Sequence, residues 1–254
     1  MSNKQGRIIE TNTHTEKDFE VLRNLEDYFQ NSIGTNNVKI SNFTKYIRTQ
    51  DLAHFLSKYE IFKKIINVPG SIVECGVLYG GGLMSFAHFS TIFEPLNHSR
   101  KVIGFDTFSG FPELSEVDKR SQSDFAKEGE MSVDSYDDLI KSIELYDSLR
   151  YINHIPKVEL VKGDVTKTIP RYIQDNPHVL VSLLYLDLDI YEPTKVALEN
   201  FVPRMPKGSI IVFDELNCKA WPGETKAFLE NLGIRKFKLE KFSFNNFRSY
   251  VILE

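Results

Sequence analysis

The feature that most constrains this chain is a repeated alternation between short apolar runs and segments of helical spacing. The alternation covers residues 72 to 232 and repeats five times. The predicted strands are 72–77, 102–105, 158–161, 179–186 and 209–213, and the predicted helices are 83–93, 135–149, 167–175, 193–204 and 224–232. Such alternation is typical of a mostly parallel sheet that is covered by helices on both faces. The predicted fold class is therefore α/β.

Both ends of the chain depart from this alternation. Near the C-terminus, 236–244 and 248–253 flank the turn-like residues 245–247, which predicts a β-hairpin that closes the sheet with an antiparallel strand. Residues 1–45 are interpreted as an extension with one helix over 18–29, ahead of a main domain over 46–254. The polar stretch 112–135 is long for a connection inside a compact domain, so we interpret it as a lid.

Composition excludes several classes of function. The 254 residues have a formal charge of -4 and no long Lys/Arg run, so we expect neither a nucleic acid nor a membrane as partner. No apolar window approaches the roughly 18 residues of a membrane span, and the first residues show no signal-peptide pattern. Cys75 and Cys218 are too far apart in sequence to predict a disulfide framework or a zinc site. We expect a cytoplasmic protein.

A tight glycine turn follows the first predicted strand. It runs from Glu74 through Gly76 to Gly80 and two further glycines, and it allows a ligand to approach the backbone and the next helix closely. The pattern is not the G-x-G-x-x-G fingerprint of dinucleotide-binding proteins, which disfavours a pyrophosphate ligand. The acidic Glu74 suits a ligand with a positive amino or sulfonium group.

Two further acids follow the second and third strands, where open α/β sheets bind ligands. Asp106, with Thr107 beside it, is placed to accept two hydrogen bonds from a ribose diol, and Asp164 suits an adenine amino group. Each acid could instead cap the helix that follows it, which is the commoner role for an isolated Asp after a strand. Taken with the glycine turn, they predict a nucleoside bound across the strand ends.

Four carboxylates are concentrated after the fourth and fifth strands, which we expect to be neighbours. Asp187 and Asp189 follow the fourth strand, and Asp214 and Glu215 follow the fifth. Because so many anions would repel one another, a divalent cation is the simplest explanation, and oxygen ligands favour Mg²⁺, with Mn²⁺ or Ca²⁺ as substitutes. An alternative is that the first pair caps the helix that begins near Pro193, but it leaves the second pair unexplained.

Four blocks of sequence together resemble the macrocin O-methyltransferase (TylF/MycF-like) family. The resemblance extends from about residue 45 to 232, and its blocks are 73–77, 104–112, 187–194 and 214–215. It implies a class I, Rossmann-like methyltransferase with a seven-stranded sheet whose last strand is antiparallel. It also implies S-adenosylmethionine as cofactor and metal-assisted methylation of a sugar hydroxyl group.

The roles of single residues follow from this resemblance. It implies that Asp187, Asp214 and Glu215 bind the metal and that Asp189 is the general base, although the roles of Asp187 and Asp189 can be exchanged. Asp187 is also expected to contact the cofactor. Family members more often carry Asp or Asn in place of Glu215, so either its longer side chain or a water molecule fills the third ligand position. A metal would orient and acidify the hydroxyl group whose proton the base accepts.

Other functions stay open on the sequence alone. A catechol- or phenol-type metal-dependent O-methyltransferase would use the same fold, cofactor and acids, and would differ in its acceptor pocket. The glycine pattern disfavours a nucleotide-binding oxidoreductase, and intact acids at each strand end disfavour a non-catalytic domain. We expect a small hydroxylated acceptor, and the helical N-terminal extension predicts a homodimer.

Overall fold

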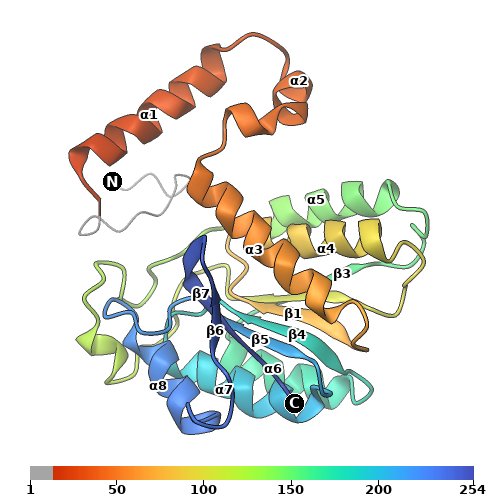
Figure 1. The fold of residues 1–254 in the computed structure, drawn as a ribbon, viewed down its shortest axis with the longest axis vertical. Coiled ribbons are helices and arrows are strands. Elements are labelled where there is room, and N and C mark those ends of the chain that lie inside the picture. Colours follow the sequence, from red (N-terminus) through yellow and green to blue (C-terminus); the bar gives the residue numbers. More distant parts are fainter. Residues whose placement is uncertain (1–13) are drawn as a thin grey trace.

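The centre of the protein is a seven-stranded sheet in the order β3-β2-β1-β4-β5-β7-β6 (Figure 1). The structure is a computed structural model that describes residues 14–254. Strands β1 to β5 are parallel, and β7 is antiparallel to both of its neighbours, β5 and β6. The predicted α/β class is confirmed, with its seven strands and antiparallel last strand. The strands are β1 (Ser71–Cys75), β2 (Val102–Asp106), β3 (Val158–Lys162), β4 (Val181–Leu186), β5 (Ile210–Phe213), β6 (Glu240–Phe242) and β7 (Asn245–Ile252).

Helices cover both faces of this sheet (Figure 1). Because side chains alternate along a strand, the central strands contribute side chains to a hydrophobic core on each face of the sheet. Ile72 and Tyr185 pack with the first set of helices, whereas Val73 and Leu184 pack with the second. No helix in the described part of the chain is long and apolar enough to cross a membrane. The first set is α3 (Thr49–Ile65), α4 (Gly81–Phe93) and α5 (Tyr136–Ser148), and the second is α6 (Val165–Asp175), α7 (Tyr191–Phe201) and α8 (Pro222–Asn231).

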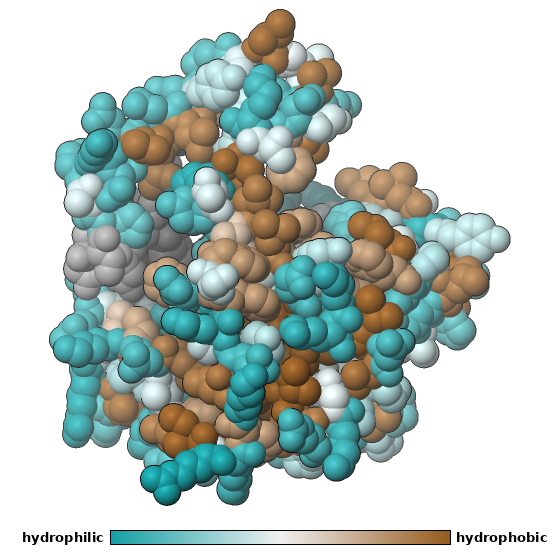
Figure 2. Space-filling view, in the orientation of Figure 1, coloured by the Kyte–Doolittle hydropathy of each residue, from teal (hydrophilic) through white to brown (hydrophobic). Residues whose placement is uncertain are grey.

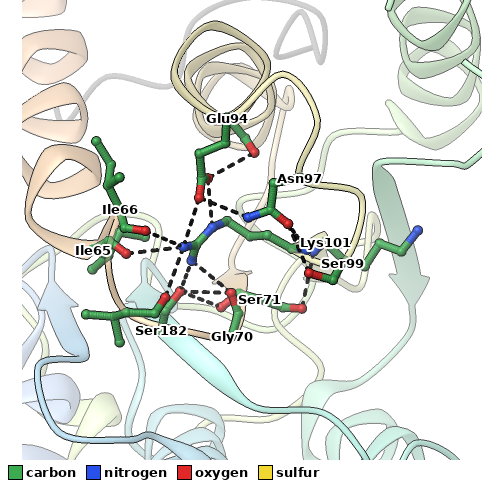
Figure 3. Close-up of polar contacts among 12 residues, drawn as sticks. Ile65, Ile66, Gly70, Ser71, Glu94, Asn97, Ser99, Lys101 and Ser182 are labelled. Carbon is green, nitrogen blue, oxygen red and sulfur yellow. Dashed lines mark hydrogen bonds and ion pairs between the residues drawn. The ribbon is translucent and has the colours of Figure 1, made fainter. Parts of the chain in front are cut away.

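A buried arginine, Arg100, holds together the amino ends of the strands. Its Nε lies 2.8 Å from Oε2 of Glu94 at the end of α4, and its guanidinium group also donates to the carbonyl groups of Ile65 and Gly70 and to the hydroxyl group of Ser182. Figure 3 shows these groups converging from α3, α4, β4 and the start of β1. The network lies at the edge of the sheet opposite the carboxyl ends of the strands.

The hairpin turn predicted at residues 245–247 is wrong. A two-residue turn over 243–244 joins β6 to β7, so Asn245 opens β7. Asn245 is buried, and its side-chain amide donates to Oγ of Ser57 on α3 at 3.1 Å. A contact with a distant helix therefore holds in a strand a residue whose type favours turns.

The N-terminal arm consists of α1 (Glu16–Asn31) and α2 (Asn36–Ser41), and it stands away from the sheet (Figure 1). The helix predicted over 18–29 is confirmed, α2 was not predicted, and residues 1–13 of the predicted extension lie outside the described part. A capping box of Thr15 and Asp18 begins α1. The ammonium group of Lys39 on α2 donates to two carbonyl groups near the end of α1. Two short 3₁₀ helices, Phe43–Lys45 and Val202–Arg204, adjoin α2 and α7.

Candidate active site

A cavity of about 270 Å³ opens at the carboxyl ends of the strands, beside the β1-β4 pair where the strand order reverses. This volume is near the lower end of the range for small-molecule sites. The walls come from the β1-α4 turn, the ends of β2 and β3, the β4-α7 loop and the predicted lid. Most of the predicted site residues line it, namely Glu74, Gly76, Asp106, Thr107, Asp164, Asp187 and Asp189, whereas Gly80, Asp214 and Glu215 lie outside the lining.

The glycine turn after β1 depends on the absence of side chains at two positions. Gly76 has a φ of +90°, and a Cβ atom there would lie 1.8 Å from the carbonyl oxygen of Asp187. Gly80 has a φ of +83° and is the N-cap of α4, where a Cβ atom would meet Leu139 of α5. Gly76 therefore lets the ends of β1 and β4 approach closely, whereas Gly80, predicted to contact the cofactor, makes room for a helix instead.

Glu74 is buried at the end of β1, with 2% of its surface exposed. Its Oε1 lies 3.7 Å from Nζ of Lys58, and its Oε2 is a buried atom without a hydrogen-bond partner among the described residues. Burial raises the pKa of Glu74 to about 7, against the lowering effect of Lys58. Because a buried acceptor without a partner is costly, this oxygen suits a cationic or hydrogen-bond-donating ligand group.

Asp106 supports the glycine turn from β2. Its Oδ2 accepts hydrogen bonds from the backbone amides of Val77 and Leu78 at 2.7 and 2.8 Å, and its Oδ1 accepts one from a third amide at 2.7 Å. A carboxylate has about four acceptor positions, so acceptor capacity is left for a ligand hydroxyl group. The Oγ1 of Thr107 donates to the carbonyl oxygen of Gly110 at 2.8 Å and holds the loop that leads into the lid.

Asp164 is the N-cap of α6, so the helix-cap alternative applies to this acid. Its Oδ1 accepts from the backbone amide of Thr166 at 3.0 Å, and its Oδ2 lies 3.1 Å from Nζ of Lys167. The pKa of Asp164 is lowered because, although partial burial disfavours the charged form, contacts with Thr166 and Lys167 favour it more strongly. The residue serves the helix and the cavity wall together.

Asp187 and Asp189 both face the cavity from the β4-α7 loop. The N-cap of α7 is Ile190, which makes no side-chain cap, and the backbone amide of Tyr191 instead donates to Asp118 of the lid at 3.1 Å. The alternative in which the two acids cap this helix is therefore wrong. Asp189 has a φ of +62°, a left-handed conformation that is uncommon outside glycine and often found at functional sites.

The two acids after β5 do not line the cavity. Asp214 is buried and forms an ion pair with Arg248 of β7, whose Nε also donates to the hydroxyl group of Tyr185 at 3.2 Å. Burial raises the pKa of Asp214 well above its ordinary value, and Arg248 opposes this. The backbone amide of Glu215 donates to Oε1 of the buried Glu224 on α8 at 3.2 Å.

Three charged residues around the site are not predicted from the sequence: Lys58, Glu224 and Arg248. They do not follow a parallel strand but lie in a helix, at a helix start and in the antiparallel strand. A signal was available for Lys58 alone. It shares one face of α3 with buried apolar residues at helical spacing, where a lysine is unexpected: Ile61, Phe62 and Ile65.

The predicted lid is packed against the β4-α7 loop and the start of α8. Phe111 and Trp221 have ring centroids 5.6 Å apart, and Leu114 packs with Ile190 and Trp221. The lid contains the 3₁₀ helix η3 (Asp118–Arg120), and its Met131 lines the cavity. Trp221 is buried and belongs to the packed cluster beneath the lid.

The sheet order, the glycine turn and the acids at successive strand ends define a Rossmann-like fold of the class I methyltransferases. Residues 41–236 match the model of the macrocin-O-methyltransferase (TylF) family, which covers most of the chain. The chain belongs to this family of O-methyltransferases. The family resemblance read from the sequence is thereby confirmed.

Solved structures agree with this assignment. CalS11, a calicheamicin methyltransferase, is 32% identical with a TM-score of 0.89 over 98% of both chains. An apo structure of CalS11, described as a TDP-rhamnose 3'-O-methyltransferase, is 30% identical with a TM-score of 0.81 over 94% of this chain and 95% of that one. The O-methyltransferase NovP, at 20% identity and a TM-score of 0.62 over 79% of both chains, shows the shared fold alone.

A curated relative from Streptomyces olivaceus is 8-demethyl-8-(2,3-dimethoxy-alpha-L-rhamnosyl)-tetracenomycin-C 4'-O-methyltransferase. It is 29% identical over 156 residues, which are 58% of this chain and 53% of the relative. The match therefore spans about half the length of that relative.

Proposed function

We propose that this protein transfers the methyl group of S-adenosylmethionine to a hydroxyl group of a sugar or of a sugar-bearing small molecule. The observation that carries the proposal is the placement of Asp187 and Asp189 in a cavity at the strand ends, in a chain of the macrocin-O-methyltransferase family. The names of two relatives support a sugar acceptor, since one contains TDP-rhamnose and the other a rhamnosyl group.

The residues of the cavity fit S-adenosylmethionine. This cofactor carries a sulfonium group, an ammonium group and two ribose hydroxyl groups, and it supplies the methyl group when bound. Carboxylates in the wall suit these groups, and the buried Oε2 of Glu74 accepts no hydrogen bond from the described residues. The proposed cofactor contacts are Glu74, Gly76, Asp106, Thr107, Asp164 and Asp187.

Asp189 is the proposed general base. A sugar hydroxyl group has a pKa far above neutral and has to lose its proton as its oxygen bonds to the methyl carbon. Asp189 faces the cavity and accepts that proton, while the bond from the methyl carbon to sulfur breaks and its electron pair stays on sulfur. Asp187 stands two residues away in the same wall and orients the reacting groups.

Metal assistance, which the sequence predicts, is a separate and more specific hypothesis about this reaction. Carboxylates are the ligands that Mg²⁺ prefers. In the described arrangement, however, Arg248 already compensates Asp214, and residues 14–254 contain no group of three or more His, Cys, Asp or Glu side chains placed to hold a metal. The side chains of the described residues, as placed, do not fit a metal. A site built on Asp187, Asp214 and Glu215 requires Arg248 to leave Asp214.

A methyl-transfer assay tests the proposal. The acceptors are nucleotide-activated 6-deoxyhexoses, rhamnosylated aromatic compounds and simple catechols, each incubated with methyl-labelled S-adenosylmethionine. Labelled sugar products that disappear with the Asp189→Asn variant would support the proposal. Transfer to catechols alone would favour the phenol-type alternative. Failure to bind S-adenosylhomocysteine, the demethylated cofactor, would reject methyl transfer altogether.

We also propose that two copies of the chain associate through the N-terminal arm. Helix α1 buries no residue, and the arm exposes large apolar side chains. Figure 2 shows apolar side chains among polar ones over this part of the molecule. The most exposed are Ile33 (88%) and Ile40 (65%).

A further inference from the structure

Lys58 is the single cationic side chain among the described residues that line the cavity, which also holds five carboxylates. It lies in the middle of α3, with 9% of its surface exposed. Its ammonium nitrogen is 3.7 Å from Oε1 of Glu74 and 3.7 Å from the ring centroid of Tyr185. Burying an ammonium group is costly unless its charge is compensated. The buried charge of Lys58 therefore has to be compensated by neighbouring groups.

The contact with Glu74 accounts for this charge only in part. A hydrogen bond between an ammonium and a carboxylate group spans about 2.7–2.9 Å, which is shorter than the 3.7 Å between Lys58 and Glu74. The ring of Tyr185 stabilises one side of the ammonium group through its π electrons. An ammonium group has three donors, and Lys58 is part of the cavity wall, where a ligand can reach it.

The proposed cofactor has one group that the other charged side chains of the cavity would repel. Its amino-acid end carries an ammonium and a carboxylate group on the same carbon atom. The ammonium and sulfonium groups suit an acidic wall, whereas a carboxylate group next to five other carboxylates needs a cation. Lys58 and Glu74 place a positive and a negative charge side by side. The positive charge can face the carboxylate group of this amino-acid end, and the negative charge can face its ammonium group.

We propose that Lys58 and Glu74 bind the amino-acid end of S-adenosylmethionine as one charge-complementary pair. Lys58 donates to the carboxylate group of the cofactor, and Oε2 of Glu74, which has no partner among the described residues, accepts from its ammonium group. This inference rests on the proposed function. It makes Lys58 the residue that distinguishes the cofactor from adenosine derivatives without a carboxylate group, and it explains a lysine on the apolar face of α3.

Calorimetric titration with two ligands tests this role. One ligand is S-adenosylhomocysteine, and the other is S-adenosyl-3-thiopropylamine, which is the same molecule without its carboxylate group. Wild-type protein is expected to bind the first at least about tenfold more tightly. Lys58→Met keeps a long apolar side chain against Tyr185, and it should weaken the first ligand about 10- to 100-fold while it changes the second by less than about threefold. The preference should then disappear.

Two further variants separate this role from a structural one. Lys58→Arg keeps the charge and should retain part of the preference, and Lys64→Met, on an exposed position of the same helix, should leave both affinities unchanged. Equal weakening of both ligands by Lys58→Met would overturn the inference, because it would show that Lys58 acts only through Glu74 or the fold. A wild-type protein that binds both ligands equally would overturn it as well. A wild-type protein that binds neither would overturn the proposed function too.

Discussion

Asp189 faces the cavity from a left-handed backbone position, with a φ of +62°. Asparagine tolerates this conformation as well as aspartate does and has nearly the same volume, so Asp189→Asn removes the base without disturbing the loop. We expect kcat for methyl transfer to fall by a factor of about 10² to 10⁴. The affinity for S-adenosylhomocysteine, measured by calorimetry, should stay within about threefold. A variant with unchanged kcat would assign the base elsewhere, with Asp187 next to be tested.

Glu74 gives cofactor binding a dependence on pH. Burial raises its pKa to about 7, so the carboxyl group is mostly protonated at pH 6 and mostly ionised at pH 8. Only the ionised form attracts the ammonium group of the ligand, so affinity for S-adenosylhomocysteine should rise by up to about tenfold from pH 6 to pH 8. Titration calorimetry at each pH measures this rise. Glu74→Gln should bind more weakly at pH 8 and show a flat profile, and a profile that survives in this variant would assign the titration to another group.

The elements of this fold differ in how well the sequence predicts them. The parallel strands and their helices follow from local hydrophobic periodicity, because each strand is buried by its own neighbours. The hairpin turn was misplaced because Asn245 is held in β7 by Ser57, which lies 188 residues away. Contacts between residues distant in sequence also limit what can be predicted of the site. Acids that follow strands can be found from strand order, but Lys58 and Arg248 come to the site from a helix face and from an antiparallel strand.

The Arg100 network joins α3, α4, β1 and β4 at the edge of the sheet opposite the cavity. Arg100→Met leaves buried carbonyl groups and the largely buried Glu94 without their partner. Thermal or denaturant unfolding should show a loss of about 3–5 kcal/mol in the free energy of unfolding. Because the network is remote from the cavity, the affinity of the folded variant for S-adenosylhomocysteine should match that of the wild type. Weaker binding by folded protein would show that the two edges of the sheet are coupled.

Arg248 on β7 determines whether a metal can use Asp214. The guanidinium group compensates this buried carboxylate, so a cation has to displace it. We expect Arg248→Met to bind Mn²⁺ at least about tenfold more tightly than the wild type does, as followed by electron paramagnetic resonance. The unfolding temperature of the variant has to be measured alongside, since an uncompensated buried charge is destabilising. Wild-type activity that is lost in EDTA and restored by Mg²⁺ would support metal assistance with Arg248 displaced.

At the scale of the whole molecule, the N-terminal arm needs a partner surface. A 16-residue helix that buries none of its residues gains little from tertiary packing, which supplies most helix stability in proteins. The capping box and Lys39 fix the ends of α1, but large apolar side chains of both helices stay exposed, namely Val21 and Tyr28 of α1 and Val38 and Ile40 of α2. A second copy of the chain supplies the same apolar surface, so a symmetric contact between two arms buries both.

Sedimentation velocity of the full chain tests this arrangement. We expect a dimer at micromolar concentration for the wild type and a monomer for the Ile33→Glu/Ile40→Glu variant, because two charges would be buried in each half of the contact. Asn37→Glu, at an exposed polar position of α2, adds charge to the same helix and should leave the dimer intact. If the double variant binds S-adenosylhomocysteine as the wild type does, the arm serves association and not the cofactor site. A wild-type monomer would leave α1 stabilised by its caps alone and would contradict the dimer.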